Sequence, residues 1–97
     1  MVSPYRDSKI DNHSFLRYFS ENVDLDELIW HRDKKDREIS VLEGNDWQLQ
    51  MDNCLPIKLE KSKNYYIPAE VYHRLIAGKE NLVLKIQELG DKNVYSE

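Results

Sequence analysis

Two histidines and one aspartate in this chain have the residue types of a metal site. His31 and Asp33 lie two positions apart at the end of an apolar run, and His73 lies five positions after Pro68. If residues 31–33 are extended, the side chains of His31 and Asp33 point to the same face, because side chains alternate along a strand. Two imidazoles and one carboxylate form the facial triad of non-haem Fe(II) sites, which leaves coordination positions open. We therefore predict a divalent-metal site at His31, Asp33 and His73, with Fe(II) favoured and Zn, Mn or Ni as alternatives.

Arg37 lies four positions after Asp33 and permits two interpretations of this site. A guanidinium offers no lone pair to a cation, and it repels a divalent ion unless an anion lies between them. In the first interpretation the metal is bound and Arg37 clamps an anionic substrate, because its planar fork matches a carboxylate. In the second, Arg37 pairs with Asp33 in place of the metal, and both histidines are ordinary hydrogen-bonded residues. Glu38 is a further candidate ligand, but alternation would point it away from the face of Arg37.

Three further polar residues are candidates for contact with a bound substrate. Gln48 and Gln50 alternate with apolar residues over 47–51, so their amides share one face of the expected strand. If that face lines a pocket, the amides orient a polar ligand; if it faces solvent, they are ordinary surface residues. Tyr66 lies among several tyrosines near Pro68, where it either donates a hydrogen bond to the substrate or has a structural role.

Short strands separated by turns account for most of the chain. Apolar and polar residues alternate with a period of two, turn residues recur roughly every 8–12 residues, and no long segment has helical periodicity. Seven or eight such strands indicate an all-β sandwich or barrel. We expect a polar N-terminal arm at 1–12, the barrel at 13–90 and a polar tail at 91–97. The expected strands are 25–31, 38–43, 47–51, 55–60, 65–67, 72–77 and 82–87, with a further short element around Phe15 and Tyr18.

Length and charge limit the classes of function. With 97 residues the chain forms one domain with a modest core, so a homodimer that adds apolar burial is expected. The net charge of −4 and the absence of a basic tract argue against a nucleic-acid partner. The apolar runs are too short to span a membrane, and the first residues contain no apolar signal region. Cys54 is the single cysteine, which excludes an intrachain disulfide and fits a reducing cytoplasm.

The spacing of the residues around His31 resembles the first of two half-motifs of the cupin superfamily. That half-motif reads His-x-His, three or four residues, Glu, six residues, Gly. His31 matches its first histidine, and Gly44 matches its glycine. Asp33 stands at the position of the second histidine, and Arg37 stands at that of the glutamate. One of the family's ligands is therefore exchanged for another competent ligand, and one for a residue that cannot ligate.

The second half-motif reads Gly, five residues, Pro-x-Gly, two residues, His, three residues, Asn. Pro68 and His73 match its proline and its histidine. Ser62 and Glu70 replace the two glycines, and Ala77 replaces the asparagine. The pattern is similar to that of small single-domain cupins, including those of cyanobacterial phages.

The resemblance implies an all-β cupin-like barrel, a double-stranded β-helix or jelly roll, which often holds one metal ion. Two functions remain open on this basis. The first is a metal-dependent enzyme that acts on a small anionic molecule, as an oxygenase or, through Lewis-acid chemistry, as an isomerase or lyase. The second is a metal-free, non-catalytic binding or assembly module with an Asp33–Arg37 pair in place of the metal. The fold itself does not decide between them, because one fold hosts many activities.

Overall fold

Eight β-strands make up the regular structure of this computed structural model, which describes residues 5–20 and 28–89. The described residues contain no α-helix, and hence no helix long and apolar enough to cross a membrane. The strands are β1 (Tyr5–Lys9), β2 (Ser14–Phe19), β3 (Arg37–Glu43), β4 (Gln48–Met51), β5 (Ile57–Lys58), β6 (Asn64–Ile67), β7 (His73–Ile76) and β8 (Leu82–Glu88).

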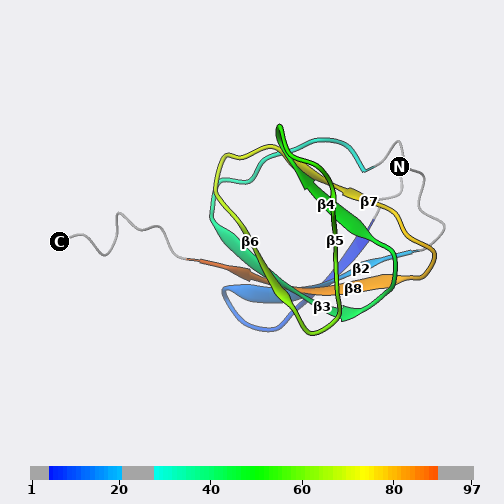
Figure 1. The fold of residues 1–97 in the computed structure, drawn as a ribbon. Helices are drawn as coiled ribbons and strands as arrows, with labels where there is room; N and C mark the ends of the chain where they lie inside the picture. Colours follow the sequence, from blue (N-terminus) through cyan, green and yellow to red (C-terminus); the bar gives the residue numbers. More distant parts are fainter. Residues whose placement is uncertain (1–4, 21–27, 90–97) are drawn as a thin grey trace.

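The strands form two antiparallel sheets that face each other and enclose the interior (Figure 1). The larger sheet has the order β1-β2-β8-β3-β6, and the smaller has the order β5-β4-β7. Strand β8 lies between β2 and β3, although these three strands are far apart in the sequence. This all-β architecture confirms the fold class that the sequence predicts.

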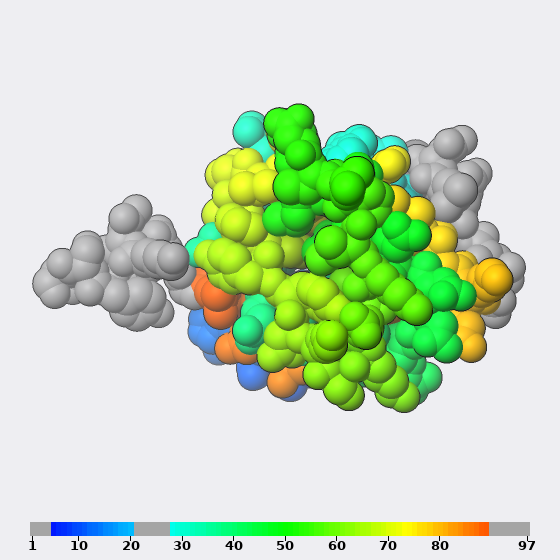
Figure 2. All heavy atoms as spheres, in the orientation of Figure 1, coloured from blue at the N-terminus to red at the C-terminus, as the bar shows by residue number. Residues whose placement is uncertain are grey.

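Alternation along the strands builds the core between the sheets. In β8, Leu82, Leu84 and Ile86 are buried, whereas Lys85 between them is exposed. Trp47 is fully buried, and its indole N–H donates a hydrogen bond of 2.6 Å to a main-chain carbonyl, so no polar group is left unsatisfied there. Side chains fill most of the space that the ribbons leave open on the face shown in Figure 2. The remaining buried apolar residues are Phe19, Ile39, Val41, Leu49, Leu59 and Ile67.

The segment before β3 differs from the sequence prediction. A strand was expected over 25–31, of which 25–27 lie outside the described residues. Residues 28–30 form no strand, and His31 makes only an isolated bridge to His73. The apolar run was misleading because Ile29 and Trp30 are exposed, by 65% and 39%, rather than buried in a sheet. The strand expected over 55–60 is also shorter, since only β5 is regular.

The polar residues expected to form an N-terminal arm include a regular element. Tyr5–Lys9 form β1, which pairs with β2 at the edge of the larger sheet. All five of these residues are exposed, which explains why their sequence lacks the apolar alternation of a core strand.

Three positions that the cupin half-motifs reserve for glycine have left-handed backbone conformations. The φ angle is +122° at Gly44, +69° at Ser62 and +64° at Glu70. Glycine adopts such angles without steric cost, whereas residues with a Cβ are strained there. Ser62 and Glu70 therefore have a conformation that glycine favours at positions where the half-motif has glycine, which supports the alignment.

Candidate metal centre

Main-chain hydrogen bonds hold the loop 31–36 against the end of β7. His31 and His73 exchange both of their main-chain hydrogen bonds, with N–O distances of 3.0 and 2.8 Å. The carbonyl of Asp33 accepts a hydrogen bond of 2.7 Å from the N–H of Glu70. These contacts bring His31 and Asp33 to His73 without a regular strand, so the two histidines are direct neighbours rather than residues that meet across the barrel.

The three predicted ligands lie together. The rings of His31 and His73 are 4.4 Å apart, centre to centre, and meet at 61°. Oδ2 of Asp33 is 3.3 Å from Nε2 of His73. One ligand atom from each of the three residues lies within 4.8 Å of the other two. Because His73 is buried, Asp33 half-buried and His31 exposed, the group extends from the core to the surface.

Main-chain carbonyls orient both imidazoles. Nδ1 of His31 is 3.1 Å from the carbonyl oxygen of Ile29, and Nδ1 of His73 is 2.9 Å from that of Val71. A carbonyl oxygen only accepts, so we infer that Nδ1 carries a proton in each ring and that Nε2 is the nitrogen a metal would bind. Metal-binding histidines are commonly held in this way by a hydrogen bond from the other ring nitrogen.

Arg37 joins the site from the first position of β3. Its Nη1 is 3.3 Å from Oδ2 of Asp33, and its Nη2 donates a hydrogen bond of 3.0 Å to Oε2 of Glu88. The contact with His73 lowers the pKa of Asp33, and the charge of Arg37 acts in the same direction, while burial of the carboxyl opposes both. Asp33 is therefore ionised at neutral pH, as a metal ligand must be.

The donor set fits a divalent cation. Oδ2 of Asp33 is buried and has no hydrogen-bond partner, because the contacts with His73 and Arg37 lack hydrogen-bond geometry. An unsatisfied buried polar atom costs about 1–3 kcal/mol. A divalent ion would satisfy this oxygen together with the lone pairs of His31 and His73. The interaction between Asp33 and Arg37 seen here leaves that oxygen unsatisfied.

A cavity of about 220 Å³ adjoins the three ligands. His31, Asp33, Arg37 and His73 line its polar part, and Arg17 contributes a second guanidinium. The other lining residues are Tyr5, Phe19, Leu28, Ile29, Ile39, Leu49, Ile67, Leu75, Leu84 and Ile86.

The structure does not bring the two predicted glutamines to this cavity. Leu49 between them is buried and lines the cavity, so alternation turns Gln48 and Gln50 to the opposite face of β4. The side chain of Gln50 accepts a hydrogen bond from Nε of Arg74 and donates one to the carbonyl of Cys54. Their placement matches the surface alternative of the prediction.

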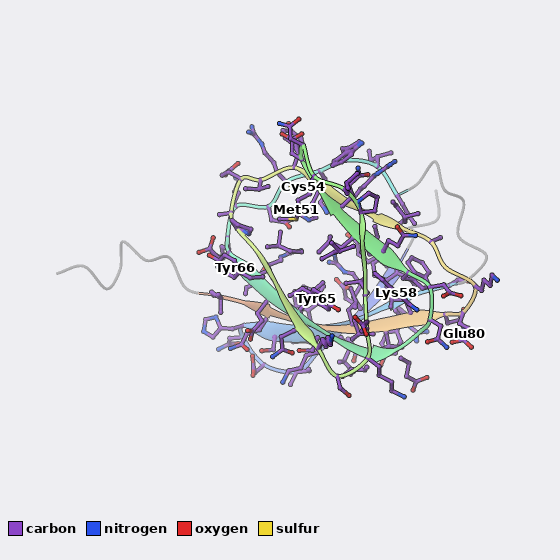
Figure 3. The ribbon with its side chains drawn as sticks, in the orientation of Figure 1. Met51, Cys54, Lys58, Tyr65, Tyr66 and Glu80 are labelled. Atoms are coloured by element: carbon purple, nitrogen blue, oxygen red, sulfur yellow. The ribbon has the colours of Figure 1, made fainter. Side chains whose placement is uncertain are left out.

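Tyr66 and Glu38 also lie apart from the three ligands. Tyr66 is exposed on the outer side of β6, whereas the adjacent Tyr65 packs against the core (Figure 3). A hydrogen bond with the carboxylate of Asp36 raises the pKa of Tyr66. Glu38 is not among the grouped ligand atoms of the described residues. Its neighbour Ile39 is buried, so alternation points Glu38 outward, as expected.

Two charged residues of the larger sheet were not predicted to belong to the site. Glu88 is the partner of Arg37 in the pairing of β3 with β8 and binds its guanidinium. Arg17, on β2, lines the cavity and binds Asp7 of β1 through two contacts of 2.8 and 3.0 Å. Both arrangements depend on which strands become neighbours, and no local sequence pattern indicates that.

Comparisons with solved structures identify the fold. A structure of the DMSP lyases RdDddP and RnDddQII is 18% identical, covers 79% of this chain and has a TM-score of 0.69. A cupin-2 domain protein from Shewanella frigidimarina is 22% identical over 88% of this chain and 79% of its own, with a TM-score of 0.63. Fe(II)-HppE with the alternative substrate (S)-1-HPP is 15% identical over 78% of this chain, with a TM-score of 0.64.

These matches confirm the predicted cupin fold. The chain spans only 37% of the length of the lyase structure and 41% of that of HppE. No protein-family model matches this sequence, and no curated protein matches it. The similarity is therefore one of fold, and the function must be argued from the site itself.

Proposed function

We propose that this chain binds one divalent metal ion through His31, Asp33 and His73, and that the ion acts on a small molecule bound in the adjoining cavity. The supporting observation is the buried Oδ2 of Asp33, which has no hydrogen bond and lies beside two imidazoles oriented by carbonyls. Fe(II) is the favoured ion because two histidines and one carboxylate are its characteristic ligands in oxygenases. Zn, Mn and Ni suit the same donors.

Metal-assisted chemistry of the oxygenase, isomerase or lyase type is the proposed activity. The similar structures include lyases and an Fe(II)-containing protein, which supports this choice. A bound ion would supply Lewis-acid or redox chemistry. The described residues would hold the ion, admit a small molecule beside it and, through the apolar cavity wall, exclude water from its reacting part.

Arg37 is better supported as a positioning residue than as a substrate clamp. Both of its Nη atoms already contact carboxylates, those of Asp33 and Glu88. A guanidinium held by Glu88 fixes the direction from which Asp33 approaches the imidazoles. Clamping of a substrate would require Arg37 to release one of these carboxylates.

The second candidate is a metal-free binding or assembly module. It is favoured by the contact of 3.3 Å between Nη1 of Arg37 and Oδ2 of Asp33, which places a positive charge beside the carboxylate. In this case the two imidazoles and the carboxylate are structural, and metal ions leave the stability of the protein unchanged.

Elemental analysis decides between the two candidates. The protein is purified without chelator or affinity-tag metal, and its unfolding temperature is then measured with Fe(II), Mn(II), Ni(II) and Zn(II). We expect near-stoichiometric metal and a raised unfolding temperature, because an ion that binds only the native state stabilises it. In His31→Ala both effects should be lost, and the exposure of His31 makes misfolding of this variant a minor concern.

His13→Ala is the matched control, because His13 is exposed and lies in the turn between β1 and β2. It should retain the metal content and the thermal shift of the original protein. His73→Ala should also lose the metal. If the original protein contains no metal and its unfolding temperature does not change with any ion, the proposed metal site is wrong and the metal-free module is favoured.

A further inference from the structure

We propose that the cavity beside the metal centre takes a small monocarboxylate with an apolar body, and that its carboxylate binds at the metal. This inference rests on the proposed function, since it needs the bound ion. The first observation that supports it is that the cavity wall has two parts. One part is polar and lies around His31, Asp33 and His73, and the rest consists mostly of aliphatic side chains. Among the latter, Ile39, Leu49 and Leu84 are buried core residues that cannot turn away from a ligand.

The charges of the site favour a ligand with a single negative charge. Two neutral imidazoles and the carboxylate of Asp33 leave a divalent ion with one net positive charge. The guanidinium of Arg37 adds one positive charge, and its partner Glu88 removes it. One carboxylate on the ligand therefore brings the site to neutrality, which matters because an uncompensated charge in a partly buried site is costly.

Both guanidiniums that the described residues contribute to the cavity wall already form ion pairs, so a dianionic ligand would compete with these pairs. Arg17 is held by Asp7 through contacts of 2.8 and 3.0 Å and lies 3.7 Å from the centre of the Tyr5 ring. Arg37 is held through its two Nη atoms by Asp33 and Glu88, and only its buried Nε has no hydrogen-bond partner. A phosphate ester that binds a guanidinium through its Nη atoms would have to break one of these ion pairs. We therefore expect the cavity to discriminate against phosphorylated compounds.

Calorimetry on the metal-loaded protein tests this proposal. The probes are straight-chain monocarboxylates from acetate to hexanoate, the amide of each acid, inorganic phosphate and glucose 6-phosphate. Affinity for the acids should rise about three- to fourfold per methylene group until the cavity is full, because each buried methylene contributes about 0.8 kcal/mol. The amides, phosphate and the sugar phosphate should bind at least tenfold more weakly than the best acid.

A cavity variant shows whether the chain of the acid enters the cavity. Leu75→Phe narrows the cavity at a half-buried position and should remove most of the increase in affinity that longer acids show. Leu55→Phe, at a position 85% exposed and outside the cavity wall, should preserve that gain. If Leu75→Phe fails to fold, the chain-length series in the unmodified protein still decides the matter.

The outcomes separate this proposal from the proposed function. Three results with metal-loaded protein would contradict the proposed ligand class: no binding of the acids, affinity that does not depend on chain length, or tighter binding of glucose 6-phosphate than of the acids. None of these results would contradict the metal centre itself. Equal affinity of the acids for metal-free and metal-loaded protein overturns the role of the ion in binding. Failure to load metal is seen by elemental analysis before any ligand is added, and it removes both proposals.

Discussion

Arg37 is the residue that most distinguishes this site from the cupin pattern. It stands where the half-motif has a metal-binding glutamate, and its guanidinium lies 3.3 Å from the carboxylate of Asp33. A cation at this position limits the protein to three ligands and leaves more of the coordination sphere of a bound ion open. It also repels the ion, so the affinity for metal should be lower than in a four-ligand site.

Arg37→Glu should therefore bind divalent metal at least tenfold more tightly than the original protein. The substitution supplies a fourth ligand and places three carboxylates, those of Asp33, Glu88 and the new side chain, where only a cation relieves their repulsion. The Kd for Zn(II) and Mn(II), measured by competition with a chelator, checks this expectation. Arg32→Glu is the control, because Arg32 is exposed and is not one of the grouped ligands. An equal gain in both variants would indicate a general charge effect and contradict the alignment of the first half-motif.

The ionisation of Asp33 predicts how the metal-free protein responds to acid. Its pKa is lowered in the folded state, chiefly by His73, below the value of about 3.9 of an unfolded chain. The resulting stabilisation is fully present above about pH 4 and is lost as pH falls through the folded-state pKa. Between pH 5 and pH 2, chelator-treated protein should lose more free energy of unfolding than Asp33→Asn does. Parallel pH curves for the two proteins would show that the carboxyl is not coupled to folding.

Two turns between strands have a left-handed residue other than glycine at a position where the cupin half-motif has glycine. Ser62 and Glu70 have positive φ angles, and the N–H of Glu70 holds the carbonyl of Asp33. A turn that supports the site is thus built with a strained residue. Such strain costs about 1–3 kcal/mol per residue and persists only where the surroundings enforce it.

Ser62→Gly should raise the free energy of unfolding by about 0.5–1 kcal/mol. Relief of the left-handed strain exceeds the greater freedom that glycine gives the unfolded chain. Urea denaturation followed by tryptophan fluorescence measures the change, since Trp47 lies in the core. The adjacent Lys63→Gly serves as control and should be destabilising, because Lys63 is not among the described residues with positive φ. If both variants lose stability, the turn tolerates Ser62 without strain.

At the scale of the whole molecule, the barrel is a small structure with a limited core. The chain has a mass of 11.6 kDa, and large apolar side chains remain exposed, including Ile29 and Leu55 outside the strands and Ile57 in β5. A domain of this size buries a smaller fraction of its surface than a larger one does. The homodimer expected from the sequence would add the missing burial, and it stays a prediction.

Sedimentation equilibrium at micromolar concentration should give about twice the mass of 11.6 kDa. Dilution should lower the unfolding temperature, because the stability of a dimer depends on protomer concentration. Measurement with and without metal shows whether assembly and the metal centre are coupled. A single species with the mass of one chain across the concentration range would contradict the prediction.

The fold class and the three candidate ligands could be predicted from the amino-acid sequence alone. Strand periodicity is a local property, because alternation of side chains follows directly from backbone geometry. The spacing of the half-motifs identified His31, Asp33 and His73, which the structure brings together. The same local reasoning failed at residues 28–30, where Ile29 and Trp30 are exposed, and it left the faces of Gln48 and Gln50 undecided.

The surroundings of those ligands depend on which strands become neighbours in the folded chain. Glu88 reaches Arg37 because β8 lies between β2 and β3, a pairing between residues 51 positions apart. Arg17 enters the cavity wall, already paired with Asp7, because β1 adds to the edge of the same sheet. These contacts depend on the order of the strands, which is set by how all of the apolar faces are buried together. Local residue types and spacing do not contain that information, so the charge balance of the site could be derived only from the folded chain.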